Sequence, residues 1–196
     1  MPEAHEELEQ AEHTEHAAGS NKKIALVIAI MALFLAFSET LGKSANTEAL
    51  NLNIKASDTW AFFQAKNIRR TTLTTAVETK KVDALTASDA LKPALAKQIE
   101  EWEKTVARYS SDPQTREGLD ELFMRAQEAE HERDSALARY HHYEIASAAF
   151  QIGIVLCSAA VITATIWLAW VASGVAALGL VFMALGLFAP QLLHLA

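Results

Sequence analysis

The sequence predicts an all-α membrane protein with three transmembrane helices and a long, coiled-coil-like helical insert between the first and the second. Residues 145–196 contain no Asp, Glu, Lys or Arg, whereas about a quarter of the residues in a soluble domain are charged. A helix rises about 1.5 Å per residue and a bilayer core is about 30 Å thick, so this stretch is long enough to cross a membrane twice. A separate apolar run over residues 24–37 predicts a third span.

The chain begins with an acidic segment, residues 1–23, which we expect to be a flexible tail. It carries most of the net charge of −7 and ends in Lys22 and Lys23. The first transmembrane helix is predicted over residues 24–41. A cleaved signal peptide would have a short basic leader and a small-residue cleavage site, and neither is present here. We therefore expect this helix to be retained.

Residues 42–144 contain 15 Lys and Arg and 17 Asp and Glu, so we expect a water-soluble insert. Apolar residues spaced three or four apart predict helices throughout it. We expect breaks near residues 86–89 and at Ser111-Asp112-Pro113, with Asp112 capping the next helix. The β-branched run over residues 71–75 would permit a kink. The apolar sets that define these helices are Leu50, Ile54, Ala61, Ala65, Ile68 and Ala76; Leu91, Leu95, Ile99, Trp102 and Val106; and Leu119, Leu122, Ala126, Ala129, Ala136 and Tyr140.

The charge-free stretch is predicted to form transmembrane helices over residues 145–171 and 175–193, joined by a tight turn at residues 172–174. Trp167 and Trp170 then lie at the end of the second span, where interfacial aromatics are common. Small residues along both spans would let the helices approach closely. Either the two helices of the hairpin pack on each other through these residues, or a second copy does.

Few residues suggest chemistry. Glu39 is the only ionisable group within a span, so it lies either at the interface or on an ion path. His13 and His16 in the tail, and His141 and His142 at the mouth of the second span, offer too few ligands for a metal site. We expect the latter pair to lie at the headgroups. With one cysteine, Cys157, and no catalytic motif, we expect no enzyme activity, no cofactor and no metal.

We expect the protein to be a scaffold or accessory subunit, because its apolar stripes are too long for one stalk to bury. The expected partners are the lipid bilayer and either further copies of the chain or subunits of a larger membrane complex. No region has the basic excess of a nucleic-acid binder, and no small-molecule substrate is indicated. The alternative is a small oligomeric channel or transporter subunit that uses Glu39. The residues expected to mediate packing and assembly are Trp60, Phe63, Trp102 and Tyr140 in the insert, and Gly153, Gly179 and Gly186 in the spans.

The basic and aromatic stretch over residues 54–70 is expected to meet the acidic part of the last insert helix, rather than lipid headgroups. The acidic residues concerned are Glu128, Glu130, Glu132 and Asp134.

Two stretches carry a family resemblance: KASDTWAFFQAK at residues 55–66, and RYHHY at residues 139–143 leading into FQIGIVLCS at residues 150–158. With the order span, helical insert, span, span, they resemble the bacterial membrane proteins grouped as domain-of-unknown-function family 4337. The resemblance covers roughly residues 20–190. It implies a helical protein of the bacterial inner membrane and supplies no activity and no catalytic residues.

The orientation of the insert stays open at this point. Basic residues near the spans are more numerous on the insert side than on the tail side, which favours a cytoplasmic insert. The insert is longer than the loops for which this rule holds, and the basic turn typical of the family would favour the reverse. The basic residues counted are Lys43, Lys55, Arg125, Arg133 and Arg139 against Lys22 and Lys23.

Overall fold

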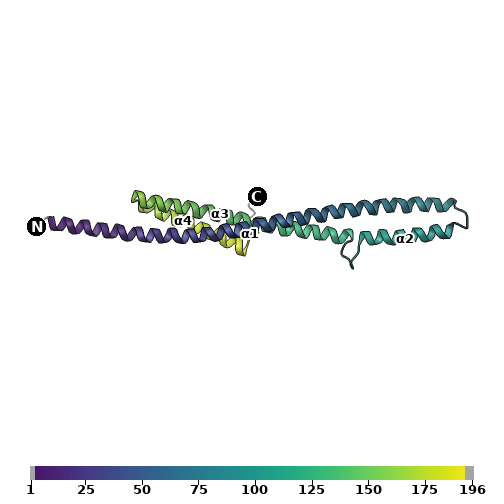
Figure 1. The fold of residues 1–196 in the computed structure, drawn as a ribbon, viewed down its shortest axis with the longest axis horizontal. Coiled ribbons are helices and arrows are strands. Elements are labelled where there is room, and N and C mark those ends of the chain that lie inside the picture. Colours follow the sequence, from purple (N-terminus) through teal and green to yellow (C-terminus); the bar gives the residue numbers. More distant parts are fainter. Residues whose placement is uncertain (1–2, 193–196) are drawn as a thin grey trace. The chain divides into compact units, whose positions relative to one another are not determined.

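The computed structural model describes the backbone of residues 3–192 and the side chains of residues 22–192. This part of the chain contains four helices and no strand (Figure 1). From Lys22 onward α1 is long and apolar enough to cross a membrane, and so are α3 and α4. The predicted all-helical chain with three helices able to span a membrane is confirmed. The helices are α1 (Glu3–Thr86), α2 (Lys92–Ser110), α3 (Leu119–Thr163) and α4 (Ile166–Phe188).

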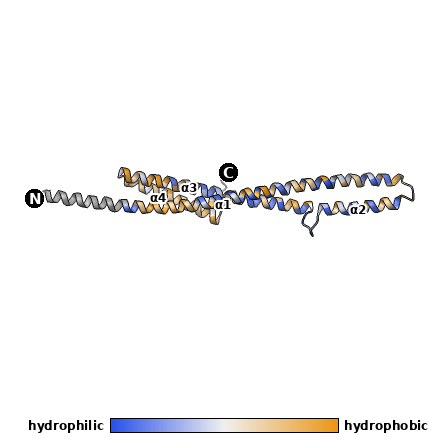
Figure 2. Cartoon of the chain, in the orientation of Figure 1, coloured by the Kyte–Doolittle hydropathy of each residue, from blue (hydrophilic) through white to orange (hydrophobic). Residues whose placement is uncertain are grey.

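The chain divides into two compact units. The membrane unit comprises Met1–Glu48 and Ser135–Ala196, and the insert unit comprises Ala49–Asp134. Helices α1 and α3 each contribute residues to both units. In Figure 2 the helices of the membrane unit are mostly orange, whereas those of the insert unit alternate between blue and orange. This difference follows the charge-free and charge-rich segments of the sequence.

Helix α1 begins at Glu3, so the segment expected to be a flexible tail has a helical backbone from that residue. The reason is composition, because this segment is rich in Ala and Glu, which are strong helix formers. The helix also continues through residues 71–75. There the hydroxyls of Thr72 and Thr75 donate to carbonyls four residues earlier, at 2.9 and 3.1 Å, so the threonines satisfy their side chains inside the helix.

The turn between the last two helices lies at residues 164–165, and its prediction at residues 172–174 was wrong. Ala164 adopts a φ of 51°, and the Thr165 amide donates to the Ala160 carbonyl at 3.2 Å. Residues 172–174 are instead inside α4, where Ala172 is buried and the Ser173 hydroxyl donates to the Ala169 carbonyl at 2.9 Å. The predicted boundaries 145–171 and 175–193 change accordingly, and Trp167 and Trp170 belong to the start of α4.

The membrane unit has a core formed where α1, α3 and α4 meet. Phe150 of α3 is its largest fully buried side chain and stacks on Phe34 of α1, with ring centroids 5.9 Å apart. Large apolar side chains on the outer faces stay exposed, as expected of helices whose solvent is hydrocarbon. The core residues are Met31, Ala146, Phe150, Cys157, Ala172 and Ala176.

In the insert unit, α1 does not bury its larger apolar side chains within the chain. Leu50, Ile54 and Ile68 belong to the apolar set from which the helix was predicted, and they are 57, 58 and 66% exposed. The face that is buried or half-buried repeats with alternating steps of three and four residues, and we call it the inner ladder. Small and polar side chains dominate it, which is why a search for large apolar residues missed it. The inner ladder consists of Ala49, Leu52, Ala56, Thr59, Phe63, Lys66, Arg70, Leu73, Val77, Lys80 and Ala84.

The two breaks expected in the insert are both present, with one difference. The first separates α1 from α2, and the Leu91 amide donates to the Ser88 carbonyl there at 2.9 Å. At the second, Asp112 accepts from the Thr115 amide at 3.3 Å, but it caps only a single turn. Helix α3 starts later, at Leu119, because the chain folds back through Gly118.

Candidate functional site

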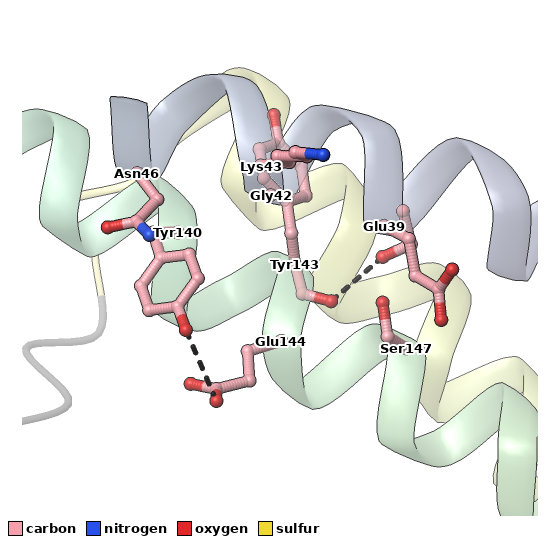
Figure 3. Close-up of a pocket in the computed structure, with 9 residues that line it drawn as sticks. Glu39, Gly42, Lys43, Asn46, Tyr140, Tyr143, Glu144 and Ser147 are labelled. Atoms are coloured by element: carbon pink, nitrogen blue, oxygen red, sulfur yellow. Dashed lines mark hydrogen bonds between the residues drawn. The ribbon is translucent and has the colours of Figure 1, made fainter. Parts of the chain in front are cut away.

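An open polar cleft of about 310 Å³ lies between α1 and α3 in the membrane unit (Figure 3). It includes Glu39, the one acid that the sequence places within a span. Its lining residues come from successive turns of the two helices, so their spacing along each helix brings them to one face. The cleft is lined by Ser38, Glu39, Gly42, Lys43, Asn46, Tyr140, Tyr143, Glu144 and Ser147.

Two small residues of α1 let α3 approach closely enough to form this cleft. The hydroxyl of Ser38, which is fully buried, donates to the backbone carbonyl of Tyr143 at 2.8 Å. A Cβ atom on Gly42 would lie 3.4 Å from the Tyr143 Cβ. This hydrogen bond links the two helices, and it also supplies the buried Ser38 hydroxyl with an acceptor.

The charged groups of the cleft are partly paired. Glu39 accepts from the Gln151 side-chain amide at 3.3 Å, and Glu144 accepts from the Tyr140 hydroxyl at 3.4 Å. Figure 3 shows Tyr140 and Glu144 pointing toward one another. The Lys43 ammonium group has no ion-pair or hydrogen-bond partner within residues 22–192, the part of the chain whose side chains are described. The cleft therefore offers two carboxylates, hydroxyls and one free ammonium group.

His142 lies near the middle of α3 and is fully buried, whereas His141 is exposed, and the expected place of the pair at the headgroups stays a prediction. The His142 Nε2 atom lies 3.1 Å from the carbonyl of Pro190, and its Nδ1 atom has no partner. Because a carbonyl only accepts, Nε2 must carry the proton of this contact. Gly186 of α4 lies against His142, because a Cβ atom added to this glycine would lie 3.2 Å from the His142 Cβ.

The three glycines selected from the sequence are all buried between helices of the same chain. At Gly153, an added Cβ would lie 3.1 Å from the Met31 sulfur, and at Gly179 it would lie 3.2 Å from the Ala149 Cβ. Of the two arrangements that the sequence left open, these contacts correspond to packing of the helices within one chain. Their use between copies stays a prediction.

Two of the four aromatic residues selected from the insert, Trp60 and Phe63, form a cluster with Phe123, which the sequence analysis missed, whereas Tyr140 lies in the membrane unit and lines the cleft. Trp60 packs edge-on against Phe63 and Phe123, with centroid distances of 5.5 and 5.6 Å. Its indole donates to Glu130 at 2.9 Å. Phe123 directly follows Leu122, which belongs to the apolar set predicted on α3. Its place beside that set is the sequence signal from which Phe123 could have been found. Trp102 is half-buried on α2.

The basic stretch of α1 does meet the acidic part of α3 within the insert unit. Lys55 and Glu132 approach to 3.6 Å, and Arg133 donates to Asn53 at 3.4 Å. The Lys66 ammonium donates to the Glu117 carbonyl. The Lys55–Glu132 pair is about half exposed on both sides, so it contributes little to stability beyond fixing the register of the two helices.

No group of three or more His, Cys, Asp or Glu that could hold a metal ion occurs within the part of the chain that was described. His13 and His16 lie outside the residues whose side chains are described.

A family model with the description "Domain of unknown function (DUF4337)" matches residues 20–189, which is most of the chain. No curated protein and no solved structure matches the sequence.

Proposed function

The chain belongs to the DUF4337 family, whose function is unknown, and from its own geometry we propose that it is a membrane-anchored scaffold or accessory subunit. It assembles with other chains through its helical insert. The observation that carries this proposal is the exposed apolar face of α1 in the insert unit. Along that face Leu50, Ile54, Ile68, Val82 and Leu85 are between 57 and 82% exposed, outside the apolar spans.

An exposed face of this kind has a thermodynamic cost in water. Burying one such Leu, Ile or Val side chain stabilises a protein by about 1.5–3 kcal/mol relative to leaving it exposed. Contiguous apolar surface on a soluble segment usually marks an interaction site. Five such residues on one face, in two pairs at its ends and Ile68 between them, supply a driving force for association.

We propose no reaction for the chain, and its role follows from which chains it brings together. The membrane concerned is, in this proposal, the inner membrane, with the insert in the cytoplasm. The excess of Lys and Arg on the insert side supports that orientation. The orientation can be tested with the substitution Lys97→Cys, which places a cysteine at an exposed position of the insert. If the insert is cytoplasmic, a membrane-impermeant thiol reagent should label this cysteine only after the inner membrane has been permeabilised.

The test of assembly is the native mass of the gently solubilised chain, with co-purifying proteins identified. The chain itself has a mass of 21.4 kDa. We expect a species of at least two chains, either copies of this one or this one with a partner. A single monodisperse species of one-chain mass would refute the proposal.

The cleft around Glu39 supports a second candidate, a subunit of a small channel or transporter. Glu39 lines an open polar cleft at the end of the apolar part of α1. If copies assemble around such a cleft, replacing Glu39 by Gln should abolish an ion flux into vesicles while the native mass stays unchanged. An unchanged flux would remove Glu39 from this role.

A further inference from the structure

The part of α1 in the insert unit carries a second regular stripe, on the side opposite to the inner ladder. We call it the outer ladder, and every one of its residues is exposed. A helix turns about 100° per residue, which places the centres of the two ladders about 150° apart. The outer ladder consists of Leu50, Ile54, Ser57, Ala61, Gln64, Ile68, Thr71, Thr75, Glu78, Val82 and Leu85.

The outer ladder keeps heptad spacing along its whole length, with six apolar and five polar residues; the polar ones are Ser57, Gln64, Thr71, Thr75 and Glu78. Its steps alternate between four and three residues from Leu50 to Leu85, which is about five heptads. Sustained repeats of more than three or four heptads are typical of coiled coils. One set of alternate positions, the a positions, contains Ile54, Ala61, Ile68, Thr75 and Val82. Four of these five residues are β-branched, and β-branched residues at a with Leu at d favour two parallel strands. The d positions are Leu at both ends of the ladder, Leu50 and Leu85, and polar between them.

We propose that the outer ladder binds the outer ladder of a second copy of this chain in a parallel, two-stranded coiled coil. This inference rests on the proposed function and names the partner in it. Copies that insert into one membrane with the same orientation run their α1 helices in the same direction, so the membrane itself selects the parallel arrangement. In that arrangement each a-position residue faces its own counterpart, for example Ile68 against Ile68.

The charges beside the ladder are compatible with this pairing. In a parallel dimer each g position faces the following e position of the partner helix. The resulting pairs bring no like charges together. They are Asn53 with Asp58, Trp60 with Ala65, Asn67 with Thr72, Thr74 with Thr79, and Lys81 with Thr86.

The size of the surface also suits a dimer. The ladder spans about 50 Å of helix, and a helix with its side chains is about 10 Å wide. The footprint is then about 500 Å² on each copy, or about 1,000 Å² for the pair, which reaches the lower bound for a specific interface. The polar d positions oppose pairing, above all Glu78, which would face the Glu78 of its partner.

Disulfide trapping in the membrane tests the proposal. In a chain whose native thiol is removed by Cys157→Ala, Ile68→Cys places a single cysteine on the ladder. The matched control is Arg69→Cys, which is the next residue, is equally exposed, and points away from the ladder. Under mild oxidation of intact membranes, we expect Ile68→Cys to give a species of two-chain mass and Arg69→Cys to give at least tenfold less. Equal trapping at both positions, or none at Ile68, would overturn the proposal.

A second measurement separates this inference from the proposed function. The substitutions Ile54→Lys and Ile68→Lys affect exposed side chains, so the chain should keep its helical circular dichroism while its native mass falls to that of one chain. A native mass of one chain in the unsubstituted protein would refute both proposals. A complex of several chains that shows no trapping at Ile68 would refute only the parallel dimer.

Discussion

Two glycines of α4 make it possible to measure the packing of the membrane unit with one and the same substitution. A Cβ atom on Gly186 would lie 2.8 Å from Cε1 of Tyr143 and 3.2 Å from the His142 Cβ, and both of these side chains are buried. A Cβ atom on Gly174 would meet nothing within 4 Å. Gly186→Ala should therefore overpack a helix contact, whereas Gly174→Ala should not.

The expected difference comes mainly from that contact. Both substitutions gain the same helix propensity, up to about 1 kcal/mol for Gly to Ala, and this gain cancels when the two variants are compared. Overpacking by one methyl group costs about 1–3 kcal/mol. We expect Gly186→Ala to have a free energy of unfolding about 1–3 kcal/mol below that of Gly174→Ala. Gly179→Ala should fall between them, because its closest contacts are at 3.2 Å.

The assay is unfolding of the full chain in mixed micelles by increasing SDS, followed by far-ultraviolet circular dichroism. The three variants should unfold in the order Gly186→Ala, Gly179→Ala, Gly174→Ala. If Gly186→Ala and Gly174→Ala unfold at the same SDS fraction, the close approach of α3 and α4 at Tyr143 is refuted.

Three further predictions concern the insert unit. Trp60→Ala removes two aromatic contacts and a hydrogen bond and should lower the free energy of unfolding of the insert by about 3 kcal/mol. Trp60→Phe keeps a ring and should lower it by about 1 kcal/mol. Hydrogen exchange of the α1 amides measures both values, and equal losses would contradict the role of the ring. Gly118→Ala would place a Cβ 2.6 Å from the Ser111 Cα and against the Asp112 amide nitrogen, so it should speed exchange in residues 111–121, while the neighbouring Glu117→Ala should not. The third prediction concerns pH. The Ser111 hydroxyl, assisted by the Asp112 amide, holds the pKa of Glu121 below its ordinary value of 4.5. A lowered pKa means that this link is fully present above pH 4.5 and is lost as the pH falls through the pKa of the folded state. The protection of the Asp112 amide, taken relative to its intrinsic exchange rate at each pH, should therefore fall in acid, and Glu121→Gln should remove that dependence.

Periodicity predicted the helices of the insert but not which face of α1 would be buried. The sequence has two ladders, and the outer one contains the larger apolar side chains, such as Ile54 and Ile68. The chain buries the inner one, with Ala56 and Thr59, because small residues let α1 lie close to α3. A spacing of three and four residues reports that a face is buried somewhere, and it does not distinguish contact within the chain from contact with another chain.

The turn at residues 164–165 could not be read from a segment without charges. Ser173 and Gly174 looked like a turn, yet both are tolerated inside membrane helices, where a hydroxyl can bond to its own backbone. The cleft was equally hidden, because the hydrogen bond from Ser38 to Tyr143 joins residues 105 positions apart. Two residues of the cleft were selected from the sequence: Glu39, because an acid within an apolar run is conspicuous, and Tyr140, which was chosen as a packing residue.

The position of the α3–α4 turn also bears on how the protein enters its membrane. The part of α3 after residue 144, the turn and α4 contain no Asp, Glu, Lys or Arg. Moving one Lys, Arg or Asp to the centre of a bilayer would cost about 2.5–3.5 kcal/mol on insertion scales. Trp167 and Trp170, next to the turn, are 61 and 77% exposed and suited to the interface. The hairpin can thus pass into the bilayer as one piece, with no charge to transfer at its tip. Once inside the bilayer the two helices meet at Gly179 and Gly186 of α4, which lie against Ala149, Tyr143 and His142 of α3.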